Sequence, residues 1–177
     1  TMLSEATNET LRISLPSKGR LSEDCLDFLA ASGLRIYKPN PRQYEAIIPA
    51  LPEARVLFQR ATDIVNSVMN GSVDFGITGL DVVAEQQGEG QEILILHEAL
   101  GFGGCSLNLA IPENWETVWN VSDLQIFTSQ LGHPVRVGTK YKNLTEKFFD
   151  DLQIPCQLIS TEGTLEIAPA IGFADMI

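Results

Sequence analysis

Short apolar runs alternate with segments of helical periodicity, and this alternation restricts the fold more than any other feature of the sequence. Residues 11–15, 55–58 and 73–77 are apolar runs that read as strands. Each of the first two is followed by apolar residues at helical spacing. Strands that alternate with short helices predict an α/β layer fold with a largely parallel sheet.

Capping residues bound the two predicted helices. Ser22, with two acidic residues behind it, suits the start of the first helix, and Thr62 suits the start of the second. Gly33 and Gly71 suit the positions directly after the helices, where a left-handed backbone conformation is common.

Three glycines in four residues, at 101–104, divide the chain. Residues 93–96 and 107–111 on either side of them are further strand candidates. We expect this segment to cross between domains, which predicts a first domain over residues 1–104 and a second over residues 105–177.

The second domain follows a similar strand and helix grammar. Residues 135–139 and 156–160 read as strands, residues 143–151 read as a helix, and residues 161–164 open what looks like one more helix. No internal repeat is visible in the sequence.

Charge and composition exclude several classes of protein. The formal net charge is −11, which argues against a nucleic-acid partner because binding a phosphate backbone requires a basic face. No run of about 18 uncharged apolar residues occurs and the first nine residues are polar and acidic, so we expect a cytoplasmic protein without a membrane segment. The three cysteines lie among apolar neighbours and are expected to be buried free thiols.

The positive charges are unevenly distributed. Residues 1–60 hold eight of the twelve Lys and Arg, whereas residues 61–135 hold none. Groups that attract anions are therefore concentrated in one segment. For any one of these side chains taken alone, a solvated surface charge is the alternative.

The tetrapeptide Ser17-Lys18-Gly19-Arg20 lies where open α/β sheets bind ligands, after a strand and before a helix. Backbone N–H groups at such a position favour anions, and Gly19 allows a phosphate to approach the backbone. Lys18 and Arg20 add charge and directed hydrogen bonds.

Two more arginines lie beside amide or hydroxyl side chains. Arg42 belongs to an Asn-Pro-Arg-Gln segment, and Arg60 directly follows the strand over residues 55–58. Arg60 is thus expected at the ligand edge of the sheet. Its alternative role is an ion pair with Asp63 on the next turn.

Residues 71–81 form the most specific motif. A strand that contains Gly76 and ends in Thr78-Gly79 before a helix presents bare backbone and a hydroxyl group to a ligand. This arrangement suits a flat base or a phosphate. The alternative is close packing of a helix on the sheet.

Five segments, taken in order, are similar to the successive motifs of the ATP phosphoribosyltransferase family. They read Leu-Pro-Ser-Lys-Gly-Arg-Leu, Asn-Pro-Arg-Gln, Phe-Gln-Arg-Ala-x-Asp, Val-Asp-x-Gly-Ile-Thr-Gly-x-Asp and Thr-Leu-Glu-x-Ala-Pro-Ala-x-Gly-x-Ala-Asp. The resemblance covers residues 11–177, whereas periodicity and charge alone reach only an anion-binding α/β enzyme or binding module. It implies two α/β domains of the type II periplasmic-binding-protein kind around a cleft.

The resemblance also implies a reaction, the first step of histidine biosynthesis. N1 of ATP displaces pyrophosphate from C1 of phosphoribosyl pyrophosphate, with magnesium as cofactor, and the product is phosphoribosyl-ATP. Such a step rests on electrostatics and on alignment of the two substrates.

Residue by residue, the resemblance makes Lys18, Arg20 and Arg60 the expected catalytic residues, which would stabilise the pyrophosphate. Glu166 is the expected magnesium ligand. The expected substrate contacts are Ser17, Gly19, Arg42, Asp74, Gly76, Thr78, Gly79, Asp81, Glu166 and Asp175.

The expected partners are ATP and phosphoribosyl pyrophosphate, in a homo-oligomer with or without a separate regulatory subunit. Family members continue past the last motif with a loop for the 5′-phosphate of the donor, so we expect the 177-residue chain to bind ATP but to be nearly inactive. A catalytically inactive fragment and a solute-binding module of the same fold are the alternatives.

Overall fold

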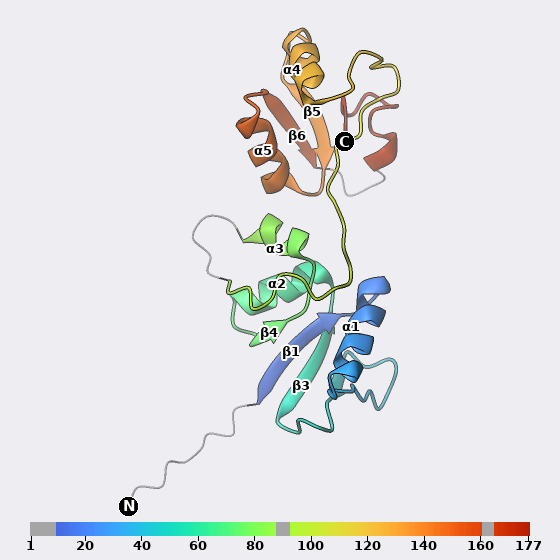
Figure 1. The fold of residues 1–177 in the computed structure, drawn as a ribbon, viewed down its shortest axis with the longest axis vertical. Coiled ribbons are helices and arrows are strands. Elements are labelled where there is room, and N and C mark those ends of the chain that lie inside the picture. Colours follow the sequence, from blue (N-terminus) through green and yellow to red (C-terminus); the bar gives the residue numbers. More distant parts are fainter. Residues whose placement is uncertain (1–9, 88–92, 161–164) are drawn as a thin grey trace, which may run out of the picture. The chain divides into compact units, whose positions relative to one another are not determined.

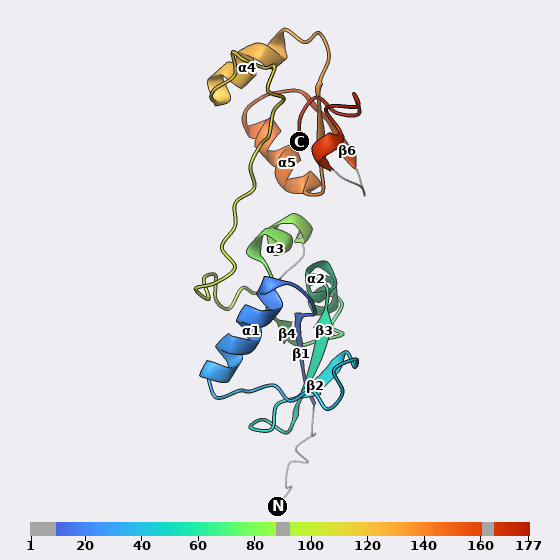
Figure 2. The ribbon, with the colours of Figure 1, turned by 90° about the vertical axis from the view of Figure 1, so that its right-hand side faces the viewer.

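The computed structural model describes residues 10–87, 93–160 and 165–177, and two views of its ribbon show a mixed α/β protein (Figures 1 and 2). The chain divides into two compact units, Thr1–Cys105 and Ser106–Ile177. The division falls one residue beyond the boundary expected from the glycine-rich segment. Each unit has its own hydrophobic core.

Unit 1 contains a four-stranded sheet with the strand order β2-β3-β1-β4. β1 (Leu11–Pro16) pairs in parallel with β3 (Ala54–Gln59) on one side and with β4 (Phe75–Gly76) on the other. β2 (Glu45–Ile47) pairs antiparallel with β3. The predicted strand at 73–77 is thus reduced to two residues.

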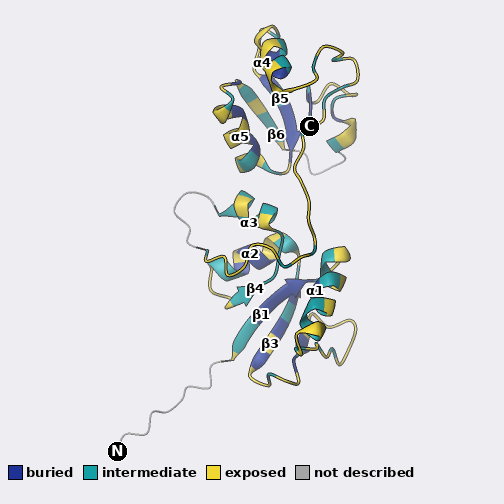
Figure 3. Cartoon of the chain, in the orientation of Figure 1, coloured by how far each residue is buried: buried dark blue, intermediate teal, exposed yellow. Residues whose placement is uncertain are grey.

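The helices of unit 1 are α1 (Arg20–Ala31), α2 (Ala61–Met69) and α3 (Leu80–Gln86). Because side chains alternate across a strand, the two faces of the sheet differ. Ile13 and Leu15 of β1 join a core that includes Leu26 of α1. Ser14 of β1 faces the other way, toward α2, and is fully buried. Colouring by burial shows most of β1 buried and buried residues alternating with more exposed ones along β3 (Figure 3).

Both predicted N-terminal caps are wrong. α1 begins at Arg20, so Ser22 lies in its first turn and donates its N–H to the carbonyl of Gly19 (3.0 Å). Thr62 likewise lies inside α2, and neither helix has a side-chain cap. Gly19 has φ +77°, a conformation that glycine adopts without strain, and the chain enters the helix through this turn instead of through a capping hydroxyl.

The two strands predicted beside the glycine-rich segment are also wrong. Residues 93–96 form no strand, and Leu94 and Leu96 expose 81% and 74% of their surface. Residues 107–111 form none either, although Ala110 exchanges two backbone hydrogen bonds with Ile177 (2.7 and 3.0 Å). An apolar run becomes a strand only where a neighbouring backbone continues the ladder, and here none does.

Unit 2 contains β5 (Val135–Thr139) and β6 (Cys156–Ser160), which pair in parallel. α4 (Val121–Ser129) precedes β5, and α5 (Lys142–Asp151) connects the two strands. A short 3-10 helix, Leu165–Ile167, follows the second strand. The predicted strands at 135–139 and 156–160 and the predicted helix at 143–151 are confirmed.

Unit 2 repeats the local layout of unit 1, although the sequence shows no internal repeat. Each unit runs from a strand through a helix to a parallel neighbour strand, and an Asp lies beside the start of the first strand. We call the resulting contacts the Arg–Asp clamps: Arg12 with Asp74 and Arg136 with Asp175. In both, the arginine backbone N–H donates to the carboxylate at 2.7 Å, and its Nη2 donates at 2.9 Å or 2.8 Å.

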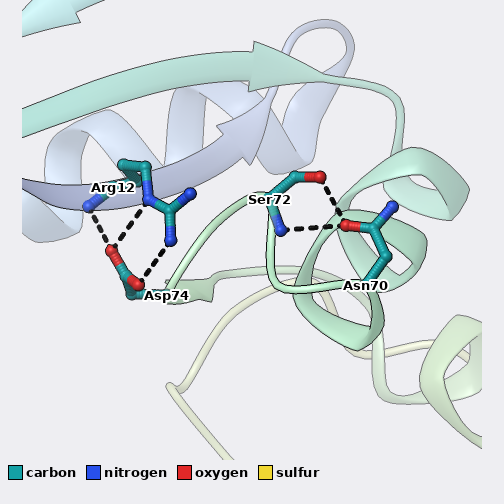
Figure 4. A network of polar contacts seen from close by, with 4 residues as sticks. All are labelled: Arg12, Asn70, Ser72 and Asp74. Carbon is teal, nitrogen blue, oxygen red and sulfur yellow. Dashed lines mark hydrogen bonds and ion pairs between the residues drawn. The ribbon is translucent and has the colours of Figure 1, made fainter.

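Figure 4 shows the unit 1 clamp beside the turn that leads from α2 toward β4. In that turn Asn70 Oδ1 accepts the backbone N–H of Ser72 (2.9 Å). The shared features of the two units are backbone geometry and one ion pair, not runs of identical residues, and therefore no repeat is visible in the sequence.

Candidate functional site

The carboxyl ends of β1, β3 and β4 lie at one edge of the unit 1 sheet, because the three strands are parallel. Backbone hydrogen bonds hold the loops that leave this edge. The N–H of Ser17 donates to the carbonyl of Gln59 (2.8 Å), and the N–H of Ile77 donates to that of Ser14 (3.1 Å). The edge is where open α/β sheets bind ligands.

A hollow of about 420 Å³ opens at this edge. Its wall includes Arg20, Asp24, Ala61, Gly79, Asp81 and Gly103, all of unit 1. Sequence reasoning missed the contribution of residues 103–105, which it assigned only to the crossing between domains. The number of glycines there was the available signal, because bare backbone can border a ligand as well as turn a chain.

The four candidate cations differ in their surroundings. Arg20 is the first residue of α1, its side chain is 92% exposed, and its Nε lies 3.8 Å from a carboxylate oxygen of Asp24. Lys18 is exposed in the loop before α1. Arg42 lies in a turn in which its N–H donates to Asn40 Oδ1 (3.0 Å).

Arg60 is exposed directly after β3, on the loop that leads into α2. Within the described residues no ion pair joins Arg60 to Asp63, so the structural role that was the alternative for this arginine is not observed. A guanidinium group at the ligand edge remains available to an anion.

The Gly76-to-Asp81 segment has mixed roles. A Cβ on Gly76 would meet Ile64 Cγ2 at 2.5 Å, so this glycine permits close packing of α2 on the sheet. Close helix packing was the alternative predicted for this segment. Thr78 Oγ1 donates to the carbonyl of Ala61 (3.2 Å), which ties the loop to the start of α2. Gly79 and Asp81 border the hollow.

Asp74 is not brought to this edge. It contacts Arg12 near the start of β1, whereas Ser17 follows the end of that strand, about 16 Å away at about 3.3 Å per residue. Hydrogen bonds from the Arg12 side chain, and then from its backbone, lower the pKa of Asp74.

Asp175 occupies the matching position in unit 2. Burial alone would raise its pKa, but the hydrogen bonds from the Arg136 side chain and backbone outweigh burial and lower it. Glu166 is exposed on the 3-10 helix. Residues 161–164, where one more helix was expected to open, lie outside the described residues.

Metal-binding side chains do not converge in the described part of the chain, where no three His, Cys, Asp or Glu could hold an ion. Glu166 could contribute one carboxylate oxygen to a Mg²⁺ ion that arrives with phosphates, as is usual for this ion. Among the described helices, none combines the length and the hydrophobicity that a bilayer crossing needs.

The cysteines differ from one another. Cys25 is buried, and burial, with the charge of Asp24, raises its pKa to about 11. Cys105 is exposed at the wall of the hollow, so its expected burial is wrong.

Comparison with known proteins gives a consistent set of relatives. ATP phosphoribosyltransferase 2, chloroplastic, from Arabidopsis thaliana is 43% identical over 175 residues, which are 96% of this chain and 42% of the relative. An ATP phosphoribosyltransferase from Brucella anthropi is 35% identical over 176 residues, which are 95% of this chain and 76% of the relative. The chain therefore spans less than half of the plant relative's length.

A solved structure has a similar fold. It is an ATP phosphoribosyl transferase (HisG:HisZ) complex from Thermotoga maritima, with a TM-score of 0.66 and 22% identity, and the match covers 94% of this chain and 71% of that chain. A family profile described as ATP phosphoribosyltransferase matches residues 60–177. This match and the identity to the Brucella enzyme show that the chain belongs to the ATP phosphoribosyltransferase family.

Proposed function

We propose that the protein transfers the phosphoribosyl group of phosphoribosyl pyrophosphate to N1 of ATP, the first step of histidine biosynthesis. The observation that carries the proposal is the hollow at the carboxyl edge of the unit 1 sheet, bordered by Arg20 and Asp81, in a chain of this family. The cations Lys18 and Arg60 lie on the loops that leave the same edge.

In this reaction the lone pair of N1 forms a bond to C1 of the ribose, and the bond from C1 to the pyrophosphate oxygen breaks. The electron pair leaves with the pyrophosphate, so negative charge grows there while positive charge grows on the ribose. Lys18, Arg20 and Arg60 are proposed to stabilise the leaving group by charge-assisted hydrogen bonds. No covalent nucleophile is needed.

Magnesium would enter with the phosphates and neutralise part of their charge. Glu166 is the proposed carboxylate ligand. Ser17, Gly19, Thr78, Gly79 and Asp81 are the proposed contacts for ATP, and they surround one sheet edge. For Arg42, Asp74, Gly76 and Asp175, a role in substrate binding stays a prediction.

We also propose the arrangement of the whole protein. The two α/β units would form a type II periplasmic-binding-protein fold with a cleft, a proposal supported by the likeness to the Thermotoga structure. We propose a homo-oligomer that a separate regulatory subunit can join. The Thermotoga structure is named as a HisG:HisZ complex, which supports an assembly with a second kind of subunit. A cytoplasmic location is proposed, with the chloroplast as the alternative because the Arabidopsis relatives are named chloroplastic.

The test is calorimetry with ATP on the 177-residue chain, followed by an assay of phosphoribosyl-ATP formation with magnesium and both substrates on a chain of the relatives' full length. We expect ATP to bind to the short chain, and product to form with the long one. Arg20→Ala should slow product formation by the long chain, while Arg35→Ala, which changes an exposed arginine away from the hollow, should not. A protein that binds no nucleotide but takes up another small solute would contradict the proposal.

A further inference from the structure

Three polar side chains form a hydrogen-bonded row between the unit 1 sheet and α2. Ser14 Oγ donates to Gln59 Oε1 at 2.6 Å, and Gln59 Nε2 donates to Ser67 Oγ at 3.0 Å. Ser14 is fully buried and Ser67 nearly so. The three residues belong to β1, β3 and α2, so the side chain of Gln59 bridges the sheet and the helix.

Apolar residues flank this hydrogen-bonded row on α2. Ile64 and Val65, which precede Ser67 on the helix, are buried and pack the helix against the sheet. An apolar residue at position 59 would satisfy burial but would leave the hydroxyl groups of Ser14 and Ser67 without this partner. Apolar contact is not directional, whereas the two hydrogen bonds of one planar amide fix the position of α2 along the sheet.

The backbone of Gln59 connects the same residue to the site. Its carbonyl accepts the N–H of Ser17, the first residue of the loop before α1, at 2.8 Å. The next residue is Arg60, and α2 begins immediately after it. Gln59 thus contacts the Ser17 loop through its backbone and the body of α2 through its side chain.

We propose that Gln59 is a positioning residue that holds Arg60 and the start of α2 in register with the loop formed by residues 17–19. The inference rests on the proposed function, since it takes this edge as the site for a nucleotide. Misalignment of two anion-binding loops weakens a ligand that contacts both, even when the fold persists. Gln59 belongs to the Phe-Gln-Arg-Ala-x-Asp motif, but its positioning role could not be predicted from the sequence, because that role depends on which side chains it meets in the fold.

Gln59→Met tests the proposal, because it keeps the length and volume of the side chain and removes both hydrogen bonds. We expect ATP to bind about 5- to 30-fold more weakly, because the loops of the site are no longer held in register. The control is Val65→Ala, which loosens α2 through an apolar residue. The comparison is made where both variants lose the same melting temperature relative to the unchanged protein. Val65→Ala should then bind ATP within about twofold of the unchanged protein, a much smaller change than that expected for Gln59→Met.

Ser67→Ala is a second variant that removes only one of the two hydrogen bonds. It tests the proposal if Gln59→Met fails to fold. It should weaken ATP binding by itself, and adding it to Gln59→Met should cause no further loss, since the bond is already absent. Equal ATP affinity in Gln59→Met, Ser67→Ala and the unchanged protein would overturn the inference while leaving the proposed function intact. An unchanged protein that does not bind ATP would instead overturn the proposed function.

Discussion

Arg20 and Arg60 present guanidinium groups at the same sheet edge in different electrostatic surroundings. Arg20 already has Asp24 within 3.8 Å, which offsets part of its charge, whereas no ion pair engages Arg60 among the described residues. An exposed pair of this length contributes little to stability. Of these two arginines, Arg60 is therefore the one whose full charge is available to the proposed leaving pyrophosphate.

Arg60→Ala should slow turnover of the full-length enzyme more than it weakens ATP binding. Loss of a contact that strengthens as charge develops costs about 2–4 kcal/mol, or about 30- to 1000-fold in rate. Steady-state kinetics with both substrates gives the two parameters. Arg55→Ala, at the opposite end of the same strand, is the matched control and should keep the normal rate. A folded Arg60→Ala enzyme with unchanged kcat would leave Arg60 as a surface residue.

Gly76 is a packing residue, whereas Gly104 borders the hollow, so the same substitution should affect stability differently at the two positions. Gly76→Ala should lower the free energy of unfolding by about 1–3 kcal/mol, because the new methyl group would meet Ile64 and the Ser14 carbonyl. Gly104→Ala adds the same methyl group at the wall of the hollow, where no atom lies within 4 Å. Urea unfolding of the two variants makes the comparison, and equal stability of both would refute this reading of Gly76.

At the scale of elements, α1 and α5 end in the same way although their sequences differ. Gly33 follows α1 with φ +79°, and Gln153 occupies the matching position after α5 with φ +57°. In both cases the next residue donates its N–H to the carbonyl five residues back, at 2.8 and 2.9 Å. This is a Schellman ending, which favours glycine at the left-handed position.

Gln153→Gly should therefore stabilise the protein by about 1 kcal/mol, since a side chain in the left-handed region carries a cost that glycine avoids. Gly33→Gln should destabilise it by a similar amount, and the two variants control for each other. Thermal or urea unfolding measures both. A destabilising Gln153→Gly would mean that the unfolded-state entropy of glycine outweighs the relief of strain.

The elements also show what could be predicted from the sequence. β1, β3, β5 and β6 were predictable because each apolar run has a partner strand in the sheet. α5 was predictable because its apolar residues recur at helical spacing. The segments at 93–96 and 107–111 have the same periodicity, but pairing depends on distant backbone that a local pattern does not contain. Of the site, the loop at 17–19 and Arg60 followed from their places after strands, whereas the bridge made by Gln59 required knowing which side chains meet.

On the scale of the whole molecule, the two Arg–Asp clamps give both units the same dependence on acid. The folded-state pKa values of Asp74 and Asp175 are lowered. Their stabilising contribution is thus complete above the ordinary carboxylate pKa and is lost as the pH falls through the lowered values.

We expect the free energy of unfolding to decrease as the pH is lowered from about 5 to about 2, and Asp74→Asn and Asp175→Asn each to flatten this decrease. Because the units have separate cores, each substitution should shift the transition of its own unit. Calorimetric scans at several pH values measure this. Asp63→Asn, at an exposed carboxylate outside the clamps, is the control, and the same pH slope in all variants would contradict the assignment.

The position of the clamps also matters for protein engineering. Each fastens the beginning of a strand, whereas the loops proposed to bind ligand leave the strand ends, so mutagenesis at one end need not compromise the other. A combinatorial library aimed at a different nucleotide could vary the proposed ATP contacts Ser17 and Asp81 while Arg12, Asp74 and the Gln59 bridge stay fixed. The residues at the strand starts, which a designer should preserve, are thereby separate from the loops at the strand ends, which can be randomised.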